Sequence, residues 1–237
     1  VDFLQEKGVN VVKAFGPEHG FRGDADAGEH VEDQIDPKTG IPVISLYGKI
    51  NKPTPEMLSD VDVLVFDLQD VGCRFYTYIY LLQRVMEAGG ENNVPVVVLD
   101  RPNPNGFYID GPILEDTCRS GIGMQPLPIV YALTIGELAK LYNGEGWLRD
   151  SVTCDLTVIP CLNYDHTMRY SLPVPPSPNL PTDRSINLYA STCFVEGTPM
   201  SEGRGTPWPF EVLGSPLIDS NATDFTFTPA PSFGDKN

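Results

Sequence analysis

Residues 16–23 (GPEHGFRG) bring a carboxylate, an imidazole and a guanidinium together between glycines. Glycines allow the backbone and a substrate to approach each other closely. Glu18 in such a loop can act as a general acid or as a nucleophile in glycoside cleavage. His19 can polarise Glu18, bind a substrate hydroxyl or ligate a metal ion. The structural alternative is a loop ion pair between Glu18 and Arg22.

Polar side chains also follow two predicted strands, at the point where each strand ends. They are Asp67, Gln69, Asp70, Arg74, Tyr76 and Tyr78 after the run 61–68, and Asp100, Arg101 and Asn103 after the run 94–99. Ligands of open parallel sheets bind beyond the carboxyl ends of the strands, so these side chains are predicted to line one site. The alternative for any single aspartate is that it caps the next helix or loop.

A third group lies late in the chain, in the glycine-rich run 194–206 (FVEGTPMSEGRGT), with Glu196, Glu202 and Arg204. Glu196 is the favoured second carboxylate, ahead of Asp67 and Asp70. Carboxylates with Arg, Asn and Tyr suit glycoside cleavage, in which one carboxyl group must be kept protonated near neutral pH by burial or by a second carboxylate.

Several other kinds of site are not supported. The chain has no G-x-G-x-x-G, Walker A or G-x-S-x-G sequence and only three histidines, so we expect no nucleotide, metal or other cofactor. The acidic run 24–33 lacks EF-hand spacing and is predicted to be a solvated loop. A net charge of −16 argues against nucleic acid and anionic lipid as partners.

The five cysteines do not form a metal-binding or paired pattern. We expect buried thiols that act as small hydrophobic side chains. If one disulfide forms, Cys154 and Cys161 are weak candidates, because they bracket a predicted strand. No apolar run approaches the roughly 18 residues of a transmembrane helix.

The elements that must position these residues follow an α/β pattern. Apolar runs predict strands at 10–15, 41–46, 61–68, 94–99 and 151–159, and the run 61–68 (VDVLVFDL) is expected to be buried on both faces. Helical spacing predicts a helix over 77–89, ended by Gly89-Gly90, and a capping box at Thr134 opens another that runs to about residue 144. The proline-rich run 172–181 is either a linker or an ordered loop over a cleft.

Six motifs of the chain together resemble the exo-β-N-acetylmuramidase (NamZ-type) family, formerly a domain of unknown function. They are FGPEHGFRGDADAGE, VDVLVFDLQDVGCRFYTY, VVVLDRPNPNG, YALTIGELAKLYN, PPSPNLPT and FVEGTPMSEGRGT, and they span about Val11 to Pro216. The resemblance implies a Rossmann-like, mainly parallel sheet flanked by helices, with a smaller C-terminal α+β auxiliary domain. Residues 1–210 would be the catalytic domain, without its N-terminal strand, and 211–237 the start of a truncated auxiliary domain.

The resemblance also implies a function: release of terminal N-acetylmuramic acid from the non-reducing ends of peptidoglycan fragments in bacterial cell-wall turnover. Glu18 would be the leading catalytic carboxylate, with His19 beside it. An arginine, one of Arg22, Arg74 and Arg204, would bind the lactyl carboxylate of the sugar. The expected location is periplasmic or extracellular. The alternative is a non-catalytic module that binds muropeptides or other carbohydrates.

Overall fold

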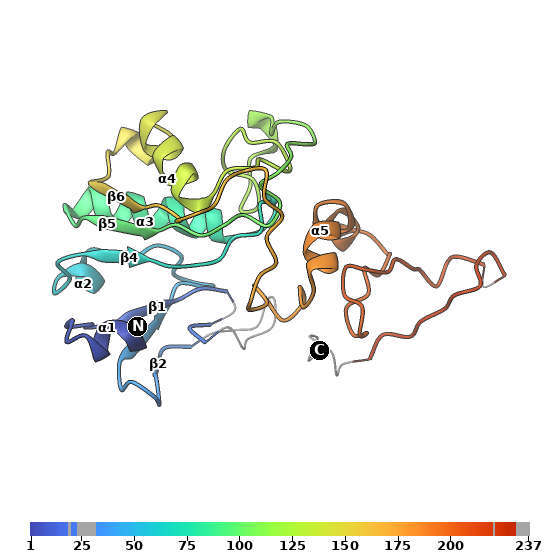
Figure 1. Ribbon diagram of the computed structural model, residues 1–237, viewed down its shortest axis with the longest axis horizontal. Coiled ribbons are helices and arrows are strands. Elements are labelled where there is room, and N and C mark those ends of the chain that lie inside the picture. Colours follow the sequence, from blue (N-terminus) through green and yellow to red (C-terminus); the bar gives the residue numbers. More distant parts are fainter. Residues whose placement is uncertain (19, 23–31, 220, 231–237) are drawn as a thin grey trace. The chain divides into compact units, whose positions relative to one another are not determined.

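The computed structural model describes residues 1–18, 20–22, 32–219 and 221–230 (Figure 1). The chain divides into two compact units, each formed by segments that are separate in the sequence. Unit 1 comprises Val1–Gln69, Thr77–Arg101 and Thr134–Asn163, and unit 2 comprises Asp70–Tyr76, Pro102–Leu133 and Tyr164–Asn237. Each unit is described by itself.

Unit 1 contains two three-stranded sheets (Figure 1). In the first, β1 (Ala14–Gly16) runs parallel to β3 (Pro42–Ser45), and β2 (Gln34–Ile35) pairs antiparallel with β3. In the second, β4 (Leu64–Phe66), β5 (Val96–Leu99) and β6 (Leu156–Ile159) are all parallel and lie in sequence order. The predicted mainly parallel α/β fold is confirmed, although its strands form two sheets.

The helices of unit 1 are α1 (Asp2–Glu6), α2 (Pro55–Leu58), α3 (Tyr78–Asn92) and α4 (Ile135–Gly144), with a 3₁₀ turn, η2, at Arg149–Ser151. The capping box predicted at the start of α4 is confirmed. The Thr134 hydroxyl accepts a hydrogen bond from the Glu137 backbone N–H (3.2 Å), and the Glu137 carboxylate accepts one from the Thr134 N–H (2.8 Å). Strand β4, helix α3 and strand β5 form the predicted βαβ unit.

Helix α3 does not end at Gly89-Gly90, as the sequence suggested, but continues to Asn92 and is closed by Asn93 at φ 56°. The two glycines allow α3 to pack closely against Val96 and Val152. A Cβ on Gly89 would lie 2.6 Å from Cγ2 of Val96, and one on Gly90 would lie 2.3 Å from Cγ1 of Val152. The helix therefore approaches its neighbours at a distance that only glycine permits, and this benefit outweighs the weak helix propensity of glycine.

The expectation that the run 61–68 is buried on both faces is wrong. In β4 the side chains alternate: Leu64 and Phe66 are buried, whereas Val65 is 46% exposed and the preceding Val63 is 45% exposed. Helices α3 and α4 contact the sheet and each other. Consecutive right-handed crossovers place such helices on the same face, so the opposite face keeps its apolar side chains exposed.

In the part of unit 2 that the structure describes, the helical elements are η1 (Asp116–Cys118), α5 (Asp183–Thr192) and η3 (Cys193–Gly197). The sequence reasoning missed α5. Its start carries a reciprocal cap between Thr182 and Ser185, a weaker signal than the usual capping box with Glu or Gln. The proline-rich run 172–181 lies wholly within this unit, where the Tyr76 hydroxyl donates to the Pro176 carbonyl at 2.8 Å.

All five cysteines are free thiols in this structure; three are buried, Cys161 is partly exposed and Cys118 is exposed. The suggested pair of Cys154 and Cys161 is wrong. Strand β6 runs between them, and seven residues of extended chain cover roughly 20 Å, whereas a disulfide needs Cα atoms within about 7 Å. None of the helices in the described ranges is long and apolar enough to span a bilayer.

Candidate active site

Glu18 lies in the loop that follows β1, at the carboxyl end of the first sheet. Tyr47 follows the neighbouring strand β3 at an equivalent distance, because Gly16 and Ser45 are in register. The Tyr47 hydroxyl lies 3.2 Å from Oε1 of Glu18 and can donate to it. Parallel pairing of two short strands is thus what brings these two side chains together.

The second carboxylate oxygen of Glu18 accepts a hydrogen bond from the Thr77 hydroxyl, at 2.8 Å. Thr77 is the N-cap residue of α3, yet its hydroxyl makes no capping hydrogen bond to the helix backbone. The first-turn N–H groups of a helix favour a negative charge nearby. Glu18 is therefore held by two hydroxyls beside the N-terminus of a 15-residue helix.

Arg22 binds two other carboxylates. Its guanidinium donates to Asp36 at 3.0 and 2.6 Å and to Asp2 at 3.1 Å. The hydrogen bonds from Arg22, with those from Thr39, hold the pKa of Asp36 well below its usual value, and the same pairing raises the pKa of Arg22. These contacts tie the 20–22 segment to the chain around β2. His19 lies outside the described residues.

The predicted site residues that follow β4 and β5 form either an exposed ion pair or hydrogen bonds that cap a helix. Asp67 and Arg101 follow neighbouring strands and form an ion pair, with Arg101 Nε and Nη2 at 2.8 and 2.6 Å from one Asp67 oxygen. Both side chains are more than 40% exposed. Asp100 instead accepts hydrogen bonds from the Thr134 hydroxyl (2.9 Å) and the Gly136 N–H (2.7 Å). Asp100 thus caps the start of α4, as a strand-end aspartate can.

Of the predicted site residues that the structure describes, unit 1 therefore holds seven, which are Glu18, Arg22, Asp67, Gln69, Tyr78, Asp100 and Arg101. Tyr78 is 6% exposed at the start of α3, so its ring is part of the core. Unit 2 holds Asp70, Arg74, Tyr76, Asn103, Glu196, Glu202 and Arg204.

Asp70 is a buried carboxylate of unit 2. It accepts hydrogen bonds from the Tyr131 hydroxyl and from the Gly72 backbone N–H, the latter at 2.8 Å. The residue is 3% exposed. Burial raises the pKa of Asp70 to about 6, against an ordinary value of 3.8, although the hydrogen bonds from Tyr131, Gly72 and Val71 act in the opposite direction. Asp70 is therefore a carboxyl group that can change its protonation near neutral pH.

Arg74, Tyr76 and Asn103 are buried side chains of unit 2 that form hydrogen bonds with backbone groups. Arg74 is 6% exposed and donates to the backbone carbonyls of Leu127 and Pro112, the latter at 3.0 Å. Asn103, 2% exposed, accepts from the Asn105 N–H at 2.8 Å and donates to the Leu133 carbonyl at 2.8 Å. Their contacts hold irregular backbone in place, because buried carbonyl and N–H groups need partners.

Glu196, Glu202 and Arg204 form one cluster, as their shared loop suggested. Arg204 lies 2.6 Å from Glu196 and 3.5 Å from Glu202, and its guanidinium stands over the Phe210 ring at 5.1 Å. The side chains of Glu196 and Arg204 are about 30% exposed, whereas that of Glu202 is 8% exposed. Glu196 is thus the more accessible of these two carboxylates.

The sequence reasoning missed Tyr47 and Thr77 in unit 1 and Tyr131 in unit 2. Tyr47 had a signal, because it follows a predicted strand at the same sheet edge as Glu18. The helical spacing of 77–89 indicates only that a helix begins near Thr77, and no short-range pattern connects Tyr131 to Asp70, 61 residues away.

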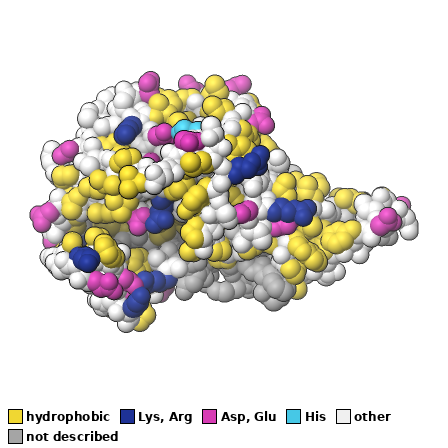
Figure 2. Space-filling view, viewed as in Figure 1, with side chains coloured by type: hydrophobic (Ala, Val, Ile, Leu, Met, Phe, Trp, Pro, Cys, Tyr) yellow, Lys and Arg dark blue, Asp and Glu magenta, His cyan; other side chains and the backbone are white. Residues whose placement is uncertain are grey.

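Basic side chains on the visible face occur singly or in small groups among acidic and apolar ones, with no extended basic patch (Figure 2). This distribution agrees with the net charge of −16. Within the described ranges, no three His, Cys, Asp or Glu side chains gather in a way that could hold a metal ion.

Comparison with known proteins identifies the family. The model of the N-terminal part of exo-beta-N-acetylmuramidase NamZ matches residues 1–184, and that of the C-terminal part matches residues 187–232. The chain is 52% identical over 232 residues to peptidoglycan beta-N-acetylmuramidase NamZ of Bacillus subtilis (strain 168), a match that covers 95% of this chain and 55% of that protein.

Two crystal structures of DUF1343 family proteins from Bacteroides fragilis NCTC 9343 are also similar. The first has a TM-score of 0.89 and 50% identity over 100% of this chain and 62% of the other. The second has a TM-score of 0.81 and 41% identity over 93% of this chain and 57% of the other. The chain thus spans little more than half the length of these relatives. Because both family models match it in order and together cover nearly all of it, the chain belongs to the exo-beta-N-acetylmuramidase NamZ family.

Proposed function

We propose that the full-length protein is a glycoside hydrolase, an exo-β-N-acetylmuramidase that releases terminal N-acetylmuramic acid from the non-reducing ends of peptidoglycan fragments. One observation carries the proposal: in a chain 52% identical to a peptidoglycan beta-N-acetylmuramidase, Glu18 follows a parallel strand and has both carboxylate oxygens held by hydroxyls. Fixing a carboxylate in one orientation is what acid–base chemistry on a glycosidic bond requires.

In this proposal Glu18 acts as acid or base, with His19 beside it, and Glu196 is the assisting carboxylate. Glu196 is favoured over Asp70 because it is more exposed. Arg22 or Arg204 binds the lactyl carboxylate. Both side chains are partly exposed and form ion pairs with carboxylates in this structure. Arg74, in contrast, is buried and donates to backbone carbonyls.

The domain that carries this site is proposed to be Rossmann-like and to end near residue 210. The substrates would be muropeptides or a disaccharide that contains N-acetylmuramic acid. Because such substrates lie outside the cytoplasmic membrane, we propose a periplasmic or extracellular location for the protein.

The test uses purified full-length protein and two disaccharides that differ only in which sugar is at the non-reducing end. We expect free N-acetylmuramic acid from the disaccharide with N-acetylmuramic acid at that end, and no cleavage when N-acetylglucosamine occupies it. Chromatography with mass detection measures both products. Binding of the first disaccharide without cleavage would instead favour the non-catalytic module. If the protein neither binds nor cleaves the first disaccharide, both functions are refuted.

Thr77 and Tyr47 are expected to act as positioning residues for Glu18. Thr77→Val and Tyr47→Phe each remove one hydroxyl while keeping nearly the same shape. A hydrogen bond to a charged group contributes about 1.5–3 kcal/mol, so kcat should fall roughly 10- to 100-fold while KM changes little. Thr77→Ser, which keeps the hydroxyl, should recover most of the rate. A change in KM alone, or a Thr77→Ser variant as slow as Thr77→Val, would contradict the positioning role.

A further inference from the structure

Two buried thiols of unit 2, Cys73 and Cys193, lie on segments that pack against each other. They come from segments 120 residues apart in the sequence, one from the 70–76 segment and one from the end of α5. Cys73 is fully buried and Cys193 is 7% exposed. The Cys73 side chain interacts with the Cys193 thiol and, together with burial, raises the pKa of that thiol.

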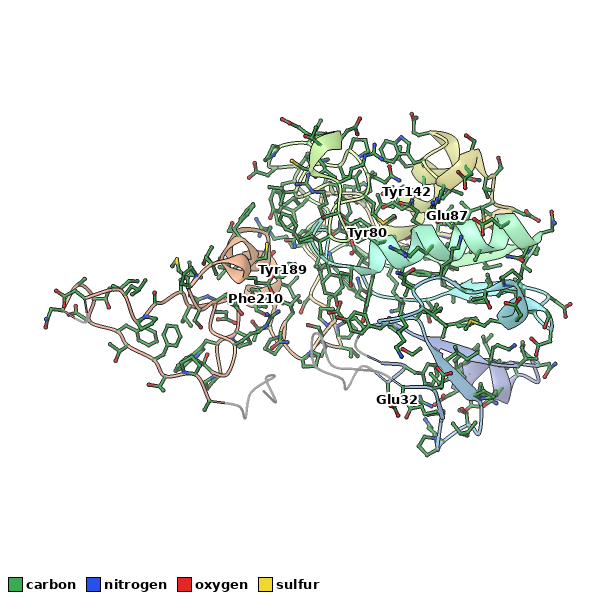
Figure 3. The ribbon with its side chains drawn as sticks, turned by 180° about the vertical axis from the view of Figure 1, so that it is seen from behind. Glu32, Tyr80, Glu87, Tyr142, Tyr189 and Phe210 are labelled. Carbon is green, nitrogen blue, oxygen red and sulfur yellow. The ribbon has the colours of Figure 1, made fainter. Side chains whose placement is uncertain are left out.

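The residues around the two cysteines hold the segments together independently of the thiols. The rings of Phe75 and Phe194 pack edge to face with centroids 5.4 Å apart, and those of Tyr76 and Tyr189 do so at 6.2 Å. Tyr189 also packs on Phe210 at 5.0 Å, and Figure 3 shows these two rings side by side. Aromatic pairs of this geometry add stability beyond the area that they bury, so the cysteines are held at close range.

We propose that Cys73 and Cys193 form a disulfide when the protein folds under oxidising conditions. In the reaction the two thiols exchange with a low-molecular-weight disulfide such as oxidised glutathione. One S–S bond forms between Cys73 and Cys193, the S–S bond of the oxidant breaks, and its two sulfurs leave as thiols with the two protons. The proposal does not depend on the glycosidase function.

Burial determines when the disulfide forms. Attack on a disulfide requires a thiolate, and the interaction with Cys73 and burial raise the pKa of Cys193 far above its usual value. The folded, reduced protein therefore reacts slowly, and the exchange takes place while unit 2 is still folding. Once formed, the bond is shielded from reductants by the same packing.

The bond would join two segments that carry candidate site residues. Cys73 lies between Asp70 and Arg74, and Cys193 begins η3, which contains Glu196. The other cysteines do not offer a comparable pair: Cys118 is exposed, and Cys154 and Cys161 are separated by β6.

The direct test is a peptide map of full-length wild-type protein that has been refolded in a buffer of reduced and oxidised glutathione. Free thiols are alkylated, the protein is digested without reduction, and the peptides are identified by mass spectrometry. We expect the peptide with Cys73 joined to the peptide with Cys193. Alkylation of both residues, or a bond from either one to a different cysteine, would overturn the proposal. This experiment needs no variant that might fail to fold.

A thermal scan gives a second, independent result. Closing so long a loop should raise the Tm of the oxidised wild type above that of the reduced protein by roughly 5 to 15 °C. Cys193→Ala should lose this difference, whereas Cys118→Ser, which changes an exposed thiol, should retain it. An equal difference in Cys193→Ala would show that another bond is responsible.

Discussion

Glu18→Gln is expected to lower kcat/KM on a chromogenic N-acetylmuramide by roughly 10²- to 10⁴-fold, the range of a lost acid–base group. Gln has nearly the shape of Glu but neither its charge nor its proton. The amide oxygen can still accept a hydrogen bond from Thr77 or Tyr47, and a hydroxyl can rotate to accept one from the amide nitrogen. The fold should therefore be retained, and the loss should appear in turnover.

The matched control is Glu145→Gln, which makes the same chemical change at an exposed position at the end of α4. Its rate and its Tm should equal those of the wild type. Glu18→Gln should keep the wild-type Tm within a few degrees. An unchanged rate in Glu18→Gln would remove Glu18 from the mechanism and with it the proposed site in unit 1.

Asp70→Asn is expected to alter the pH dependence of the stability of unit 2. The pKa of Asp70 is about 6 in the folded protein and 3.8 ordinarily, because burial disfavours the charged form. Each pKa unit corresponds to about 1.4 kcal/mol, so the shift represents on the order of 3 kcal/mol.

The direction of the pH effect on stability follows from whether the folded or the unfolded protein binds the proton of Asp70 more tightly. With a raised pKa in the folded state, the contribution of Asp70 to stability is complete below pH 3.8 and is lost as the pH rises through 6. The amide side chain introduced by Asp70→Asn does not titrate. The free energy of unfolding of the wild type should therefore fall relative to that of the variant as the pH rises.

Urea unfolding of full-length wild type and variant at pH 5 and at pH 8 measures this difference. The acidic pI of about 4.4 makes pH 5 a practical lower limit. Between these two pH values the wild type should lose on the order of 1 kcal/mol relative to Asp70→Asn. The control Asp224→Asn, at an exposed position of unit 2, should differ from the wild type by a constant amount. A constant difference for Asp70→Asn as well would contradict the buried, proton-binding carboxyl group.

Much of unit 1 could be predicted from local patterns. The apolar runs around β3 and β5 and the capping box of α4 specify their elements through interactions within a few residues. The motif around Glu18 could be chosen from its residue types alone. The sequence lacks the motifs of nucleotide, metal and serine-hydrolase sites, so carboxylates with Arg, Asn and Tyr are the remaining candidates for catalysis. The family could be identified in the same way, since its motifs are long and occur in order.

Only the tertiary structure decided which partner each polar side chain takes. Arg22 binds Asp36 and Asp2, and the strand-end Asp100 caps α4. These outcomes depend on contacts between residues far apart in the sequence, which residue type and spacing do not determine. The same reason applies to Gly89 and Gly90, which look like a helix end in sequence but permit close packing in α3. For Glu18 the sequence identified the carboxylate, whereas the pairing of β1 with β3 and the position of α3 decided that Tyr47 and Thr77 hold it.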